Sequence, residues 1–180
     1  MVQTIRIDHL LRETVTTPYR NLVTRGTGAA VRTRIEAALA QSTCRLALLD
    51  FSEVDLLDFS CADEIVAKLL RGALLATSCT VVLRGLRDDQ REAIAHVLTH
   101  QRLAVLAEQA DPPSMGVLGW ISDDARAAFA CLAGAAPLEA EALAARLGWD
   151  PVRAAAALDL LARHRLVAWA DGAFQSPSLT

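Results

Sequence analysis

The stretch from residue 46 to residue 70, LALLDFSEVDLLDFSCADEIVAKLL, constrains the fold of this chain more than any other segment. It begins with an uninterrupted apolar run that stops at Asp50, continues as an acidic, turn-forming segment, and becomes strongly amphipathic from Ser60 onward. The apolar run is typical of a strand buried in a parallel sheet, and the amphipathic part is typical of a covering helix. Loops at the carboxyl ends of parallel strands form the binding surfaces of such sheets. The segment therefore predicts an α/β fold and a site where Asp50, Asp55, Asp58 and Ser60 gather.

The first part of the chain alternates strand and helix patterns. We expect strands at residues 2–7, 21–24, 45–50, 80–84 and 103–107, and helices at residues 8–13, 29–41, 60–77 and 88–100. This alternation predicts a mostly parallel sheet with helices packed against it. Ser60, followed three residues later by Asp63, resembles a capping box, so we expect Ser60 to cap its helix. In the same helix Ile65 belongs to the apolar face, and Glu64 forms an ion pair with Lys68.

The second part of the chain has a different pattern. Residues 110–116, ADPPSMG, contain two prolines and a glycine, and we interpret them as a linker. Beyond it we expect helices at residues 122–133, 137–147 and 150–164, followed by a hairpin of residues 166–170 and 173–175 around an Asp-Gly turn. Three helices and a hairpin predict a winged helix. The chain is thus divided into an α/β domain (residues 1–110) and a small C-terminal winged helix-turn-helix domain (residues 117–180).

Composition excludes several classes of protein. With 53% hydrophobic residues the chain can bury a full core, which excludes global disorder. Its 18 basic and 21 acidic residues give a net charge of −3, which provides no general attraction to nucleic acid or to an anionic membrane. No apolar run approaches the roughly 18 residues of a membrane span, and no apolar signal-peptide core follows the first methionine. The four cysteines are scattered, with Cys44 and Cys79 each opening a predicted strand, so we expect buried thiols in a cytoplasmic protein.

Catalytic and metal-binding patterns are also missing from the sequence. There is no G-x-S-x-G, no Walker motif, no kinase signature and no dinucleotide fingerprint. Glu92, His96 and His100 share one helix face, but a metal site needs three or four convergent ligands and HExxH is absent. We interpret this face as solvent-exposed, and we expect no enzymatic activity, no metal and no cofactor.

Gly26, Thr27 and Gly28 lie at the start of a predicted helix, where backbone N–H groups can bind an anion. A lone G-x-G, with no third glycine and no Gly-Lys-Ser/Thr, is weak evidence for such a site and favours tight-turn geometry. Both readings, a turn and an anion-binding site, stay open at this point.

Two segments resemble the core of STAS domains, the fold of bacterial anti-sigma-factor antagonists. They are LDFSEVDLLDFSCADEIVAKLL, which holds the central strand and the next helix, and LVTRGTGAAVRTRIE, a glycine-bearing strand-to-helix turn. The likeness covers residues 2–108 and is closest to a STAS-like branch that has this short turn. It implies a mixed, mostly parallel sheet with helices, and a non-catalytic module for protein–protein interaction and signal transduction.

The resemblance also implies where a partner docks. In the antagonists the helix begins Asp-Ser-Ser-Gly or a close variant, and a partner kinase phosphorylates the first serine or threonine after the aspartate. With that aspartate placed on Asp58, Phe59 occupies the acceptor position and Ser60 follows, so Ser60 is the shifted candidate for phosphorylation. The implied partner is an anti-sigma factor or a histidine-kinase-like ATPase. The expected partner-binding residues are Asp55, Asp58, Phe59, Ser60, Asp63 and Glu64.

The winged helix leaves two functions open. From residue 121 onward five arginines face seven acids, a balance of −2. The expected recognition helix, DPVRAAAALDLLARHR, offers Arg153, Arg163 and Arg165 to DNA, but it has no Asn, Gln, Ser or Lys to read base edges. Winged helices also serve as protein-docking or homodimer elements. We therefore expect a non-catalytic bacterial regulator of the partner-switching type; the alternative is a DNA-binding transcriptional regulator whose STAS-like domain senses a signal.

Overall fold

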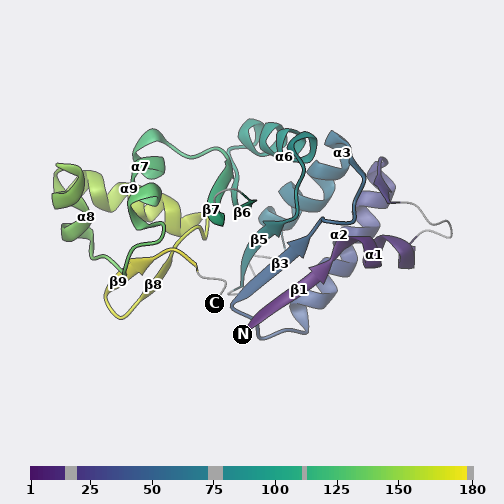
Figure 1. Ribbon diagram of the computed structural model, residues 1–180, viewed down its shortest axis with the longest axis horizontal. Helices are drawn as coiled ribbons and strands as arrows, with labels where there is room; N and C mark the ends of the chain where they lie inside the picture. The colour runs from purple at the N-terminus through teal and green to yellow at the C-terminus, as the bar shows by residue number, and fades with distance from the viewer. Residues whose placement is uncertain (15–19, 73–78, 111–112, 178–180) are drawn as a thin grey trace.

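A five-stranded sheet in the order β1-β3-β5-β6-β7 forms the centre of the computed structural model, which describes residues 1–14, 20–72, 79–110 and 113–177 (Figure 1). Its strands are β1 (Val2–Arg6), β3 (Leu46–Asp50), β5 (Thr80–Arg84), β6 (Ala104–Ala110) and β7 (Pro113–Gly119). The first four run parallel, with Leu48 opposite both Thr4 and Val82, and β7 runs antiparallel to β6. The prediction of an α/β fold with a mostly parallel sheet is confirmed.

Helices form a layer over the first face of this sheet. They are α1 (Ile7–Thr14), α2 (Arg25–Ala40), α3 (Phe59–Ala62), η1 (Asp63–Ala67), α4 (Lys68–Arg71) and α6 (Asp88–His100). Three of them, α3, η1 and α4, follow one another without a break and make one helix whose middle, η1, is π-helical. Alternate strand residues such as Leu49 and Leu83 share one buried cluster with Ile35 of α2 and Ile65 of η1. Ile65 is thus on the buried face, as its position in the apolar stripe predicts.

The second face of the sheet is covered by the C-terminal part of the chain. Leu48, Val82 and Leu106 point to this face and belong to one buried cluster with Phe129 and Leu158. The latter two come from α7 (Asp123–Leu132) and α9 (Pro151–Arg163). Figure 1 shows α7 and α9 on one side of the sheet, and α1, α2 and α3 on the other. The uninterrupted apolar run of β3 is explained because successive side chains of this strand are buried on opposite faces.

The prediction of a linker is wrong for residue 110 and for residues 113–116, whereas residues 111 and 112 lie outside the described residues. This region forms the paired strands β6 and β7, in which Ala104 lies opposite Gly119 and Ala110 lies opposite Pro113. Proline is tolerated here because Pro113 is the first residue of an edge strand, where no ladder hydrogen bond has to be donated. The sheet therefore continues almost to α7, which begins at Asp123.

The C-terminal part has the predicted order of three helices and a hairpin. Between α7 and α9 lies α8 (Ala140–Leu147), and the hairpin consists of β8 (Ala168–Ala170) and β9 (Ala173–Gln175). The expected Ser122 and Asp150 caps are present, and the hairpin turn has a positive φ at both of its central residues. The second helix starts three residues later than predicted, because Leu138 instead forms a bridge with Phe174. Among the described residues, no helix has both the length and the apolarity needed to cross a membrane.

The two buried clusters predict different effects on local stability for two buried leucines, Leu106 on the second face of the sheet and Leu83 on the first. Leu106→Ala and Leu83→Ala should each lower the free energy of unfolding by about 2–5 kcal/mol, because each leaves a cavity. Leu106→Ala should also speed amide hydrogen exchange in α7 and α9, since it removes a contact of the C-terminal helices. Leu83→Ala, on the opposite face, should instead affect α2 and α6. Unchanged exchange in α7 and α9 of the Leu106→Ala protein would contradict a shared core.

Candidate protein-docking surface

The loop after β3 is held by its own polar groups. Asp50 Oδ1 accepts hydrogen bonds from the Ser52 backbone N–H (2.9 Å) and the Ser52 hydroxyl (2.6 Å). Phe51 is fully buried, and its N–H donates to Arg84 O in the neighbouring strand (2.9 Å). A side chain at Gly85 would collide with Ser52, and the φ of +68° at Gly85 also suits glycine. Asp50 therefore shapes the loop rather than a binding surface.

A short parallel ladder brings two distant segments together beside this loop. β2 (Asn21–Leu22) pairs with β4 (Leu56–Leu57), so the predicted strand at residues 21–24 is shorter than expected and β4 is an addition. The ladder continues on both sides, since Asp55 N–H donates to Arg20 O (2.8 Å) and Asp58 N–H donates to Leu22 O (3.0 Å). A strand of two residues leaves no visible alternation in a sequence, which is why β4 was not predicted.

The ladder buries one row of side chains and exposes the other. Leu22 and Leu57 are buried, whereas Leu56 is 47% exposed and Val23, the residue after β2, is 42% exposed. In this register Val23 follows the pair of Leu22 and Leu57, so it lies opposite Asp58. The hydrogen-bonded backbone of the β2–β4 ladder therefore keeps two large apolar side chains, Val23 and Leu56, exposed to solvent.

Asp58, and not Ser60, caps the helix that follows. Asp58 has extended backbone angles, and its Oδ1 accepts a hydrogen bond from the Cys61 N–H (2.7 Å), so the helix begins at Phe59. Ser60 Oγ donates to the same oxygen (2.8 Å). The predicted capping box of Ser60 and Asp63 is wrong, because a carboxylate two residues earlier offers a charged and stronger acceptor. The predicted end of this helix at residue 77 lies outside the described residues.

Phe59 is the most exposed aromatic side chain near the helix start, at 55% of its surface. Its ring contacts the His96 ring of α6 edge-on, with centroids 5.2 Å apart. This contact fixes one edge of Phe59 and leaves the rest in solvent. We define the Phe59 surface as Val23, Asp55, Leu56, Asp58, Phe59 and Ser60.

Glu64, expected at the partner-binding edge, is buried instead. Its carboxylate is in contact with Lys68 one turn later, with Arg25 (2.9 Å) and with Arg32 (3.6 Å), the last two from α2. Burial alone would raise the pKa of Glu64, but the hydrogen bonds from Lys68 and Arg25 outweigh it and lower the pKa. The carboxylate is thus ionised and fully engaged, so the assignment of Glu64 to partner binding is wrong. The expected pair with Lys68 is confirmed.

Asp63 belongs to the same internal network. Arg25 Nη1 lies 2.9 Å from its Oδ2, and Gln101 Nε2 donates to its Oδ1 (2.6 Å). Burial would raise the pKa of Asp63, but the hydrogen bonds from Gln101 and Arg25 lower it overall. Asp63 therefore links α2, η1 and the end of α6 through its hydrogen bonds. Its negative charge is largely compensated by Arg25 of the same chain.

The G-T-G segment lies inside α2 and not in a turn before it. Thr24 caps the helix, accepting from the Thr27 N–H with its hydroxyl (3.2 Å) and from the Gly28 N–H with its carbonyl (2.9 Å). Two of the three N–H groups expected to bind an anion therefore already have acceptors. The second glycine has a packing role, since a Cβ on Gly28 would lie 3.0 Å from Glu64 Cβ and 3.2 Å from Cys61 Cα.

Three of the four cysteines, Cys44, Cys61 and Cys79, are buried thiols as expected, whereas Cys131 is only half-buried. Cys61 donates from Sγ to Thr24 O (3.1 Å), and burial, reinforced by Asp58, raises the pKa of this thiol to about 12. Cys44 and Cys79, which precede the neighbouring strands β3 and β5, have Sγ atoms 2.9 Å apart. Burial likewise raises the pKa of Cys79 to about 12. A thiol that stays protonated at neutral pH is a poor nucleophile.

The Glu92, His96 and His100 face lines a shallow hollow on α6. Within residues 1–14, 20–72, 79–110 and 113–177, no three His, Cys, Asp or Glu side chains come together as metal ligands. The contact of His96 with Phe59 links this face to the Phe59 surface.

Two of the three arginines that the sequence suggests for DNA binding form ion pairs with carboxylates of the same chain. Arg153 forms a bidentate pair with Asp124 of α7 (2.9 and 2.6 Å), and its guanidinium lies over the Trp149 ring at 4.4 Å. Arg163 pairs with Asp159 one turn earlier (2.6 Å). Both side chains are exposed, but each would have to leave a partner to contact a phosphate.

The third arginine, Arg165, points toward the sheet. Its Nη1 donates to Cys79 O, just before β5 (3.3 Å). The exposed side of α9 shows Val152, with 78% of its surface in solvent, and Asp159, rather than a basic stripe. The geometry therefore gives DNA binding little support.

The structure thus gathers four of the six expected partner-binding residues, Asp55, Asp58, Phe59 and Ser60, and adds Val23 and Leu56 to them. Val23 and Leu56 can be assigned to this surface only when the β2–β4 pairing is known, because that pairing places them there. Comparisons with protein-family models, with curated proteins and with solved structures found no match to the chain. The geometry of this surface is therefore the basis for assigning a function.

The helix cap yields a first test at this site. Asp58→Ala should lower the free energy of unfolding by about 1 kcal/mol, because it removes the acceptor of the Cys61 N–H. Ser60→Ala should change it by less than about 0.5 kcal/mol, since alanine keeps the helix and only one side-chain hydrogen bond is lost. Asp58→Asn, which keeps the cap, is the control. Urea unfolding measures all three, and a larger loss for Ser60→Ala than for Asp58→Ala would restore Ser60 as the cap.

Gly26 and Gly28 form a matched pair for a second test. Gly28→Ala should be destabilising by about 1–3 kcal/mol, because the new methyl group meets Glu64 and the Cys61 backbone. Gly26→Ala has open space and should be neutral or stabilising by up to about 1 kcal/mol. The same urea measurement compares them. Equal effects of the two substitutions would mean that α2 does not approach η1 as closely as the structure describes.

Proposed function

We propose that the protein is a non-catalytic regulatory adaptor that docks a protein partner on the Phe59 surface. The observation that carries this proposal is the exposure of Val23, Leu56 and Phe59 at the β2–β4 ladder and at the start of the helix that follows it. Exposed apolar side chains that are scattered singly are ordinary, but side chains gathered at one edge are typical of interaction sites. The β2–β4 ladder and the helix cap hold these side chains in place, so little conformational entropy is lost when a partner binds.

The chemistry of the surface indicates what kind of partner fits. An aromatic side chain with aliphatic neighbours is the usual energetic centre of a protein interface. Asp55 and Asp58 add negative charge beside it, and neither has a basic side chain within ion-pair distance among the described residues. A complementary partner presents an apolar pocket for Phe59 with arginine or lysine at its edge.

The resemblance to STAS domains supports the same location. In that family the start of the helix after the central strand docks the partner, and here this position is occupied by Phe59 and Ser60. The proposed partner is accordingly an anti-sigma factor or a histidine-kinase-like ATPase, in a pathway of the partner-switching type in a bacterial cytoplasm.

Phosphorylation of Ser60 is a physically consistent switch for this surface. The hydroxyl is half-buried and donates to Asp58 Oδ1 (2.8 Å). A phosphate on that oxygen removes the donor and places about two negative charges beside the carboxylate that caps the helix. We expect the helix start, and with it the orientation of Phe59, to be disturbed by this repulsion.

The C-terminal helices are proposed to serve as a protein contact rather than as a DNA reader. Engagement of a phosphate by Arg153 would break its pair with Asp124 and its stacking on Trp149. Such pairs reduce the electrostatic attraction on which binding to DNA depends.

The proposal is tested by capturing the partner and then weakening the surface. Tagged full-length chain from the native host should co-purify with a partner, which is then titrated against purified variants. Phe59→Ala should weaken the measured affinity at least about tenfold, because truncating an interface aromatic typically costs more than 1.4 kcal/mol. Val2→Ala, which truncates an exposed apolar residue at the start of β1, should leave the affinity unchanged. Full retention of the partner by Phe59→Ala, or an equal loss with Val2→Ala, would exclude the Phe59 surface as the docking site.

A further inference from the structure

A groove of about 500 Å³ lies between α8, α9 and the C-terminal hairpin. Ala155, Asp159 and Ala162 line it from one face of α9, where they are one turn apart. Trp169 of β8 and Phe174 of β9 line it from the hairpin. Because alanine has a short side chain, this face of α9 leaves the space beside the two aromatic rings unfilled. We call this hollow the Trp169 groove.

The hairpin side of the Trp169 groove is fixed by backbone hydrogen bonds. Leu138, just before α8, donates from its N–H to Phe174 O (2.9 Å), and its O accepts from the Phe174 N–H (2.8 Å). The Trp169 ring packs edge-on against the Phe174 ring, with centroids 4.6 Å apart. Even so, 60% of the Trp169 surface is in solvent. A preformed groove therefore presents an open tryptophan, one of the side chains most enriched at the energetic centres of protein interfaces.

The charged side chains of the Trp169 groove are all acidic. They are Glu139, Glu141 and Asp159, and no arginine, lysine or histidine lines the groove among the described residues. Asp159 is paired with Arg163 (2.6 Å), whereas in the described part of the chain no basic side chain lies within ion-pair distance of Glu139 or Glu141. Acids at the start of α8 suit the helix dipole, but the dipole does not account for the exposed Trp169 beside them. Negative charge around an apolar groove favours a positively charged partner.

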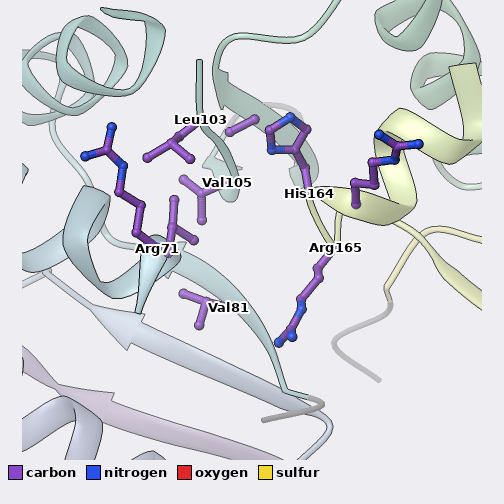
Figure 2. A pocket seen from close by; sticks show the side chains of 9 residues that line it. Arg71, Val81, Leu103, Val105, His164 and Arg165 are labelled. Atoms are coloured by element: carbon purple, nitrogen blue, oxygen red, sulfur yellow. The ribbon is translucent and has the colours of Figure 1, made fainter. Parts of the chain in front are cut away.

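A second hollow, at the starts of β5 and β6, has the opposite charge (Figure 2). There Arg71 and Arg165 stand on two sides of an apolar floor that includes Val105. Arg165 is already engaged, since its Nη1 donates to Cys79 O (3.3 Å). A basic segment is therefore repelled by this hollow and attracted to the Trp169 groove.

We propose that the Trp169 groove docks a basic amphipathic segment of a protein partner. A bulky apolar side chain of that segment packs on Trp169 and on the alanine face of α9, while its lysine or arginine side chains lie against Glu139 and Glu141. Docking of an amphipathic segment in an apolar groove is a recurrent mode of recognition. The inference rests on the proposed role of the C-terminal helices as a protein contact. Figure 1 shows the hairpin and α3 at opposite ends of the molecule, so a segment in this groove leaves the Phe59 surface free.

Short random peptides displayed on phage are the probe, selected against the immobilised full-length chain. Selected peptides are then synthesised and titrated against the wild-type and Trp169→Ala chains. We expect a group of peptides that combine lysine or arginine with a large apolar side chain and that bind Trp169→Ala at least about tenfold more weakly. In NMR spectra these peptides should shift the indole N–H signal of Trp169. They should leave the signal of Trp120, whose ring lies under the Arg102 guanidinium, in place.

A pair of charge-reversing substitutions tests the electrostatic part and leaves the hairpin unchanged. Glu141→Arg should weaken binding of the same peptides at least about threefold, because it replaces attraction by repulsion. Asp123→Arg is the matched control, since it makes the same change of charge at an exposed position in the first turn of α7, outside the groove. It should leave the affinity unchanged.

Three results would overturn the proposal. The first is that no selected peptide binds Trp169→Ala more weakly than the wild type, or that the peptides which do so are not basic. If all selected peptides instead lose affinity with Phe59→Ala, the Trp169 groove is excluded and docking on the Phe59 surface still stands. The second is an equal loss of affinity with Asp123→Arg and Glu141→Arg. The third is self-association of the full chain that Trp169→Ala abolishes, since the occupant would then be a second copy of this chain.

Discussion

Burial of β3 on both faces is the constraint on which the rest of the structure depends. Leu49 faces the layer of α2, η1 and α6, while Leu48 faces the C-terminal helices. Each buried leucine contributes about 1.5–3 kcal/mol, so neither layer can be removed without exposing a strongly apolar sheet face. The C-terminal helices are therefore part of the sheet's core as well as a unit with their own order of helices and hairpin. This explains why the hairpin of β6 and β7, and not a loose linker, leads into them.

A second constraint acts on the helical layer, where Glu64 is buried. A carboxylate without water must be paired, and Arg25, Arg32 and Lys68 surround it. Two of these cations come from α2, which can approach only because Gly28 has no side chain. The charge network thus sets the distance between α2 and η1. The network also fixes the helix whose first residue is Phe59, so the position of the Phe59 surface depends on the ion pairs of the buried Glu64.

Local signals made part of this fold predictable. β5 and α6 have the predicted bounds, because their patterns end at strong turn and capping residues, and Asp150 with Pro151 defined the start of α9. Features that depend on distant residues were not predictable. The side chain that caps the helix after β4 depends on competition between two good acceptors, Asp58 and Ser60. The burial of Glu64 depends on Arg25 and Arg32, which lie more than 30 residues earlier in the chain. For the same reason sequence analysis located Phe59 but missed Val23 and Leu56, which a ladder of two residues places beside it.

The Phe59 surface lies at one end of the helix that contains Glu64. Phe59 is the first residue of the continuous α3–η1–α4 helix and Arg71 is its last, so about 20 Å separates them at 1.5 Å per residue. A regular helix moves as a unit, but this one contains the π-helical turn η1, in which the hydrogen-bond register differs from that of its ends. The ion pairs of Glu64 hold this turn in place. A change at the far end of this helix alters partner affinity at Phe59 only if the helix has two positions that the partner binds unequally. The charged network around η1 is where such a difference in position would have to be accommodated, since it is the part of the helix most firmly tied to α2.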